Sequence, residues 1–147
     1  MFHDPMAFVN ENYPMLDAAS YDDGKDGTAG IPCGGFLFLR STPNTIALWG
    51  ELTKRHAKEM GSEQILLKKT LAERGKYEFK DINFVFLPHP KFRNGIWFKQ
   101  VKPETREKDL AQLIVLHANW MVGIDTKEKA LKNQQLWYLE NGECKAR

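Results

Sequence analysis

Few cysteines and no long apolar run restrict what this 147-residue chain can be. Its two cysteines, Cys33 and Cys144, have no second pair at the spacing of a metal finger, which argues against a disulfide framework or a zinc ribbon. A single bridge between them is left open, and we interpret both as ordinary thiols. The most apolar stretch, residues 110–124, is interrupted by polar side chains and falls short of the roughly 20 apolar residues that span a bilayer.

An excess of charge of either sign is also lacking. The chain has 21 basic and 19 acidic residues, a net charge of +2, and its basic residues are scattered. It therefore has no basic stripe of the kind that follows a phosphate backbone, and nucleic acid is not an expected partner. The N-terminus lacks a basic segment followed by an apolar core, so no signal peptide is predicted and the chain is expected to be soluble.

The composition that is present, 42% hydrophobic and 12% aromatic, is enough for the core of one α/β domain. Residues 34–40 are apolar at successive positions, which predicts a central strand covered on both faces. Residues 15–21 form a weaker strand candidate, and the glycine-rich segment 21–35 between the two predicts a long exposed loop. The remaining elements are expected in the following order: helices over residues 43–60 and 62–75, strands over 83–87, 96–99 and 113–117, and a helix from 125 or 126 to about 135.

The end of the last apolar strand is the strongest functional signal in the chain. After residue 116 the sequence delivers an imidazole, an amide and an indole in close succession, from His117, Asn119 and Trp120. Gly123 and Lys127 follow within ten residues. Since α/β proteins place ligand sites at the ends of their strands, we expect a site here.

Several landmarks then occur in a recognisable order: Asp4-Pro5, the segment 33–43, Glu63-Gln64, His117-Ala118-Asn119-Trp120, Gly123 and Lys127. In this order they resemble the nucleotide-diphospho-sugar transferase family, which includes plant and algal cell-wall xylosyl- and arabinosyltransferases of the GT-A fold. The resemblance covers residues 1–138. No single motif is diagnostic, and the specificity comes from the order.

The resemblance implies a GT-A-like, Rossmann-related mixed sheet with helices on both faces. It implies that residues 1–140 are the C-terminal part of such a domain, followed by a polar tail over 141–147. Family members carry nucleotide-binding strands and a metal-binding Asp-x-Asp motif upstream, and this sequence contains no Asp-x-Asp. The donor-binding strands are therefore expected to be missing. Asp22, Asp23 and Asp26 do not have the spacing to replace that motif, and the loop around them fails the EF-hand pattern at its terminal Glu position.

By the same resemblance, His117 would complete the shell of a Mn²⁺ ion beside the donor diphosphate. Gly123 would let the backbone approach the phosphates, and Lys127 would supply positive charge. Glu63 and Gln64 are the catalytic candidates that would face the donor sugar. The plain alternatives stay open: a hydrogen-bonded histidine, a solvated lysine, and a glutamate that complements a helix dipole.

Six further residues are candidates for binding substrate. Carboxylate, indole and amide side chains suit sugar hydroxyls and rings, and glycines allow close approach of substrate to a strand. The six are Asp22, Asp23, Gly34, Gly35, Asn119 and Trp120. For them too the alternatives are a solvated loop, a tight turn and a core tryptophan.

The expected function is transfer of a sugar from a nucleotide-diphosphate donor to a hydroxyl of a glycan or glycoprotein, with retention of configuration and with Mn²⁺. The resemblance also implies a place in the Golgi lumen. The alternative is a non-catalytic remnant or carbohydrate-binding domain of the same fold. A P-loop or dinucleotide-binding protein is set aside, because neither glycine motif of those classes occurs.

Overall fold

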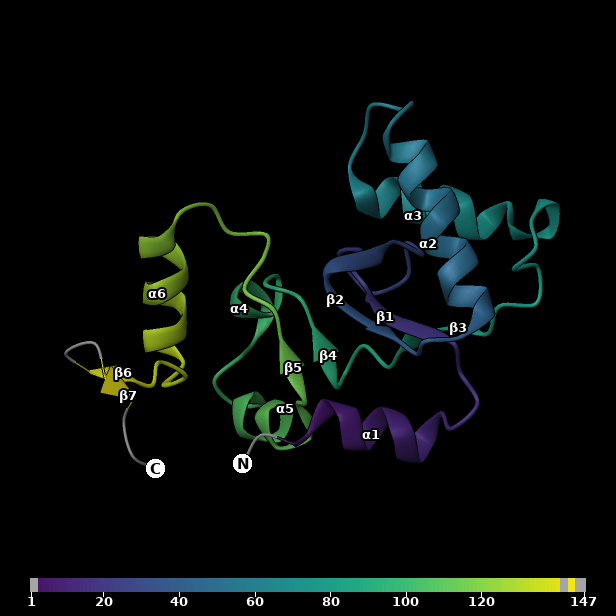
Figure 1. Cartoon of the computed structure of the whole chain (residues 1–147). Coiled ribbons are helices and arrows are strands. Elements are labelled where there is room, and N and C mark those ends of the chain that lie inside the picture. Colours follow the sequence, from purple (N-terminus) through teal and green to yellow (C-terminus); the bar gives the residue numbers. More distant parts are fainter. Residues whose placement is uncertain (1–2, 141–142, 145–147) are drawn as a thin grey trace.

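The computed structural model describes residues 3–140 and 143–144 and shows a mixed α/β arrangement (Figure 1). The helices are α1 Pro5–Asn12, α2 Pro43–His56, α3 Glu63–Ala72, the short 3-10 helix η1 Arg74–Lys76, α4 Trp97–Gln100, α5 Arg106–Gln112 and α6 Ile124–Asn133. The strands are β1 Ala18–Asp22, β2 Pro32–Leu39, β3 Phe84–Leu87, β4 Phe92–Arg93, β5 Val115–Leu116, β6 Leu139–Glu140 and β7 Glu143–Cys144. No helix in this described part of the chain has the length and apolar character required to cross a membrane.

A three-stranded mixed sheet organises the molecule, in the order β2-β1-β3. β1 pairs antiparallel with β2 and parallel with β3, and all five of its residues are buried. The prediction that residues 34–40 form a central strand is thus wrong, because β2 is an edge strand of the sheet. The central strand is β1, which corresponds to the weaker candidate at residues 15–21. β2 has consecutive apolar residues because both of its faces are covered by packed elements.

Helices cover both faces of this sheet, as predicted. On one face, α2 and α3 form a core with the strand residues Leu37 and Phe84. On the other face, α1 packs with Tyr21, Phe38 and neighbouring strand residues in a second core. Figure 1 shows α1 on the side of the sheet opposite α2 and α3. The alternation of Leu37 and Phe38 between the two cores is the period-2 pattern of a strand.

The pairing of β1 with β2 is interrupted by an irregular bulge. Ser20 pairs with Leu37 and Asp22 with Pro32, so Tyr21 alone lies opposite residues 33–36. The buried Ser20 hydroxyl fills the gap: its Oγ accepts the Cys33 N–H at 2.8 Å and lies 3.0 Å from the Phe36 carbonyl oxygen. Bulges re-aim side chains next to sites, and this one holds Cys33 and the two following glycines away from the regular ladder.

The helix after β2 begins as the sequence indicates. Thr42 caps α2 in a capping box with Thr45, and Pro43 occupies the first turn. Residues 57–62 then lead into α3, whose first turn carries Glu63. This short connection returns the chain to β2, so that the N-terminus of α3 lies beside the bulge.

Two expectations for the second half of the chain are corrected. The predicted central strand over 113–117 is only Val115–Leu116, which pairs in parallel with β4 in a separate two-stranded sheet. Residues 96–99 are not a strand but contribute to α4, because Asn94 side-chain and backbone oxygens accept the N–H groups of Ile96 and Trp97. α5 was not predicted. Of the predicted polar tail, only Glu143–Cys144 is described, as the strand that pairs with β6; positions 141–142 and 145–147 lie outside the described residues.

Candidate functional site

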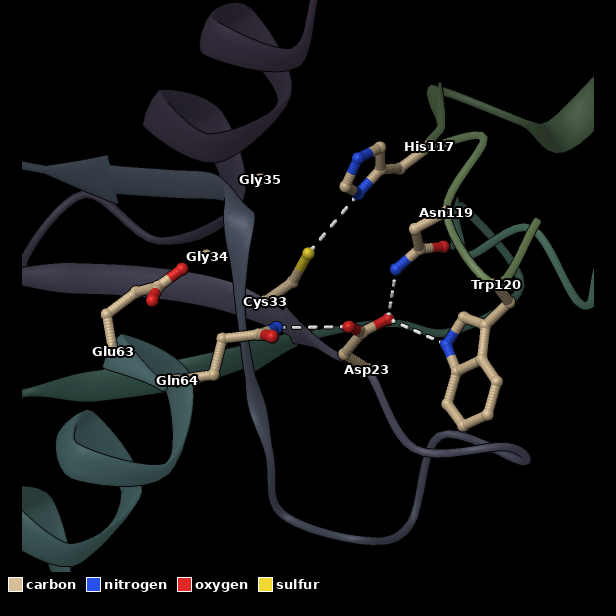
Figure 2. Close-up of a pocket in the computed structure, with 9 residues that line it drawn as sticks. All are labelled: Asp23, Cys33, Gly34, Gly35, Glu63, Gln64, His117, Asn119 and Trp120. Carbon is tan, nitrogen blue, oxygen red and sulfur yellow. Dashed lines mark hydrogen bonds between the residues drawn. The ribbon is translucent and has the colours of Figure 1, made fainter. Parts of the chain in front are cut away.

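A pocket of about 280 Å³ lies where β1, the bulge of β2, the start of α3 and the segment after β5 meet. It contains eight of the candidate site residues from the sequence, together with Cys33. The lining residues are Asp23, Cys33, Gly34, Gly35, Glu63, Gln64, His117, Asn119 and Trp120 (Figure 2). The imidazole at the end of the last strand and the acidic-amide pair of α3 therefore share one pocket, although Gln64 and His117 are 53 positions apart in the sequence.

The two glycines of the bulge allow this convergence. A Cβ atom at Gly35 would lie within 2.8 Å of both ring nitrogens of His117, which is too close for any side chain. A Cβ atom at Gly34 would lie 3.2 Å from Gln64 Cγ and 3.3 Å from Glu63 Oε1. The glycines thus let the histidine and the start of α3 approach the strand backbone directly.

The Asp23 carboxylate joins the two sides of the pocket. Gln64 Nε2 donates to Asp23 Oδ2 at 3.0 Å from one side. From the other side, Asn119 Nδ2 and Trp120 Nε1 donate to Asp23 Oδ1 at 2.6 and 3.2 Å (Figure 2). Three donors to one carboxylate hold the amide and the indole in fixed orientations.

Asp22 faces away from the pocket. Its buried carboxylate accepts the backbone N–H groups of Gly24, Gly30 and Ile31 at 2.9, 2.5 and 3.1 Å. The carboxylate therefore satisfies the backbone of the loop that joins β1 to β2. Of the two adjacent aspartates predicted to bind substrate, the structure brings only Asp23 into the pocket.

The segment after β5 is fixed by its contact with residues 93–95. The His117 N–H donates to the Arg93 carbonyl oxygen at 2.9 Å, and Asn119 Oδ1 accepts the Gly95 N–H at 2.8 Å. A Cβ atom at Gly95 would collide with the Asn119 backbone. Trp120 has a positive φ of 58° and is 51% exposed, so its indole lies at the pocket rim with its N–H on Asp23 and much of its ring open to solvent.

A buried hydrogen-bonded group that the sequence did not reveal lies under the pocket. Tyr21 Oη lies 2.8 Å from His117 Nδ1, and the Cys33 thiol donates to Tyr21 Oη at 2.9 Å. Burial raises the pKa values of the Cys33 thiol and the Tyr21 phenol, so both keep their protons at neutral pH. Burial lowers the pKa of His117; nearby Asp23 opposes this and Lys127 adds to it, leaving a neutral imidazole. In the sequence, only the position of Cys33 directly before two glycines could have indicated this buried hydrogen-bonded group.

Gly123 and Lys127 do not line the pocket. Gly123 has a φ of 84° and caps the N-terminus of α6, a helix that has no buried residue. Lys127 lies in the first turn of α6, and its positive charge contributes to the lowered pKa of His117. Their predicted contacts with donor phosphates stay predictions.

The residues around the pocket do not fit a complete metal site. Within residues 3–140 and 143–144, no group of three or more histidine, cysteine, aspartate or glutamate side chains is close enough together to hold a metal ion. The Asp23 carboxylate already accepts three hydrogen bonds, and His117 Nδ1 faces Tyr21. We therefore assign no chemical step to a metal held by these residues.

Fold and pocket together define an α/β protein with a polar, aromatic-rimmed site at the ends of its strands. A family model for nucleotide-diphospho-sugar transferases matches residues 1–131. The chain therefore belongs to the nucleotide-diphospho-sugar transferase family. Comparisons with curated proteins and with solved structures gave no match.

Proposed function

We propose that the pocket binds the sugar-diphosphate part of a nucleotide-sugar donor and serves glycosyl transfer. The observation that carries this proposal is the convergence of Glu63-Gln64 with His117 in one pocket, within a chain whose family is that of nucleotide-diphospho-sugar transferases. These three side chains come from segments that are far apart in the sequence, and the sequence alone did not require them to share a pocket.

The chemistry of the pocket suits a sugar. Trp120 offers an exposed apolar ring face against which a pyranose or furanose can stack, and its orientation is set by Asp23. The Glu63 carboxylate has no hydrogen-bond or ion-pair partner among the described residues, and it lies at the N-terminus of α3 beside Gly34. In our proposal, Glu63 accepts hydrogen bonds from sugar hydroxyls, and Gln64 lies near the anomeric centre.

The finer features of the reaction are proposals supported by the sequence resemblance. These are a closer relation to cell-wall xylosyl- and arabinosyltransferases, a glycan or glycoprotein hydroxyl as acceptor, retention of configuration, and work in the Golgi lumen. The Mn²⁺ requirement has the same support. Because the described residues do not complete a metal site, our proposal uses no metal ligand from them.

An alternative is carbohydrate binding without turnover. The exposed Trp120 ring favours it, because a stacking platform with adjacent polar groups is sufficient to bind a sugar. The two functions differ in the expected ligand: a transferase site recognises the nucleoside diphosphate, whereas a binding domain recognises the glycan alone.

Calorimetric titration of the chain with UDP, with a panel of nucleotide sugars and with free oligosaccharides, each with and without Mn²⁺, tests the proposal. Binding of UDP or a nucleotide sugar that His117→Ala weakens is the expected result. His56→Ala, at the exposed end of α2, is the matched control and should bind as the unmodified chain does. Binding of oligosaccharides without any nucleotide binding would favour the carbohydrate-binding alternative, and heat from neither class of ligand would contradict both.

A further inference from the structure

The hydrogen bonds beneath the pocket determine which nitrogen of His117 carries the proton. A neutral imidazole has one N–H and one lone pair, and the partner of one nitrogen decides the state of the other. In His117, Nδ1 faces the buried Tyr21 hydroxyl at 2.8 Å. Nε2 has no hydrogen-bond partner among the described residues and is not one of their buried unsatisfied atoms, so it is open to solvent and to a ligand.

The neighbours of Tyr21 Oη fix the direction of this hydrogen bond. The Cys33 thiol donates to Oη at 2.9 Å, and the Cys33 sulfur also lies 3.4 Å from His117 Nδ1 (Figure 2). Since the thiol hydrogen is directed to Oη, the phenol hydrogen is left for His117 Nδ1, and the 2.8 Å contact with Oη is the shorter of the two that Nδ1 makes.

We infer that the Cys33–Tyr21–His117 chain holds His117 with its hydrogen on Nε2, so that the ring presents an N–H donor to an oxygen of the bound sugar-diphosphate rather than a lone pair to a metal. Tyr21 and Cys33 are then positioning residues. The ligand part of this inference rests on the proposed function.

The tautomer itself is measured in the unliganded chain by nitrogen NMR of ¹⁵N-labelled histidines. The sequence has four histidines, and His117→Gln identifies the signals of His117. We expect Nε2 to bear the hydrogen and Nδ1 to have the shift of an accepting nitrogen. A hydrogen on Nδ1 would overturn the inference whether or not any nucleotide binds.

Two substitutions test the positioning role. Tyr21→Phe keeps the buried ring and removes the hydroxyl, so the Nδ1 signal should move toward that of a free nitrogen and a fraction of the other tautomer should appear. Cys33→Ser retains an O–H donor and should preserve the wild-type signals. An unchanged Nδ1 signal in Tyr21→Phe would refute the role of Tyr21. If Tyr21→Phe does not fold, the spectra of the unmodified chain and of Cys33→Ser still show which nitrogen of His117 bears the hydrogen.

Metal and nucleotide are then added separately. Mn²⁺ alone should not selectively broaden the ring signals of His117, whereas selective broadening would identify a metal ligand and overturn the inference. In EDTA, we expect UDP to bind, His117→Ala to weaken binding about tenfold, and His117→Gln, which keeps an N–H donor, to remain within about threefold. UDP binding that is insensitive to His117→Ala would overturn the inference. No UDP binding under any condition would instead contradict the proposed function and leave the tautomer result standing.

Discussion

At the scale of single residues, the pocket depends on the absence of a side chain at Gly35. We predict that Gly35→Ala displaces the His117 ring, because the added Cβ would lie within 2.8 Å of both ring nitrogens. The expected result is loss of UDP binding with a ring shift in the histidine NMR signals. Gly50→Ala in α2 is the control: nothing lies within 4 Å of its Cβ position, and alanine in a helix should raise the unfolding free energy by about 0.5–1 kcal/mol.

Binding by Gly35→Ala with an unshifted His117 ring would show that the strand backbone moves to accommodate the methyl group. The close approach of the ring to Gly35 would then have no functional role.

The two adjacent aspartates are predicted to have separate roles. Asp22→Asn replaces one of the oxygens that receive three backbone N–H groups by an amide N–H, and should lower the free energy of unfolding by about 1–3 kcal/mol. Urea denaturation followed by circular dichroism measures this change. Asp26→Asn in the same loop is exposed and should cost less. A larger loss for Asp26→Asn than for Asp22→Asn would contradict the anchoring role.

Residue types near the pocket were predictable where their chemistry is unusual after a strand, as for His117, Asn119 and Trp120. Tyr21 was not, because a tyrosine in an apolar segment has the same sequence pattern whether its hydroxyl is bonded to a histidine or to water. The role of Asp22 was equally hidden, since Asp22 and Asp23 differ only in which side of the strand end they face.

At the scale of elements, Asp17 connects the starts of β1, β3 and α2. Its carboxylate accepts the Asn83 N–H at 2.9 Å, the Thr42 hydroxyl at 2.7 Å and the Asn44 amide at 3.1 Å. Burial acts to raise the pKa of Asp17, but these hydrogen bonds outweigh it, and the pKa lies below its ordinary value of 3.8. The helix cap and the strand pairing are therefore coupled through one charge.

We predict that this coupling depends on pH. Because the pKa of Asp17 is lower in the folded state than in the unfolded chain, its stabilisation is complete above pH 3.8 and is lost as the pH falls through the lowered value. Asp17→Asn should therefore be less stable than the unmodified chain at pH 7, and the difference should shrink below pH 3.8. Urea denaturation across this range measures it, and a difference that stays constant with pH would contradict the prediction.

Helices α2 and α3 were predictable because their caps and apolar spacing are local signals. The positions of the strands within the sheet were less predictable from the sequence. The central place of β1 depends on pairing with β3, which lies more than sixty residues further along the chain, and no local pattern encodes that partner. α4 was mistaken for a strand since its apolar run is as short as a strand, and the Asn94 oxygens that begin the turn act through tertiary placement.

At the scale of the whole molecule, two cores share one sheet. One core contains Leu66 of α3 and the other contains Val9 of α1, and both residues are fully or nearly fully buried. We predict that Leu66→Ala lowers the free energy of unfolding by about 2–5 kcal/mol. Because β2 and β3 contribute residues to both cores, tryptophan fluorescence and circular dichroism should still report one transition. Separate transitions would show that the two faces unfold independently.

The family and the mixed α/β class were predictable from the order of motifs along the chain, and the family model covering residues 1–131 confirms the family. The site was predictable only in part. The sequence indicated which side chains belong to it, but their meeting depends on the bulge of β2 and on the return of α3 to that bulge. Both are properties of the packed structure.

The bond from Asn119 to Asp23 spans 96 positions, and the bond from Trp120 to the same carboxylate spans 97. A molecule seated between these segments would act as a removable cross-link, since it can bind only when both ends of that long loop are in place. Ligand binding would raise the free energy of unfolding, and the increase would grow with the logarithm of the ligand concentration. Melting temperature thus becomes an assay for the natural ligand that needs neither a known acceptor nor turnover.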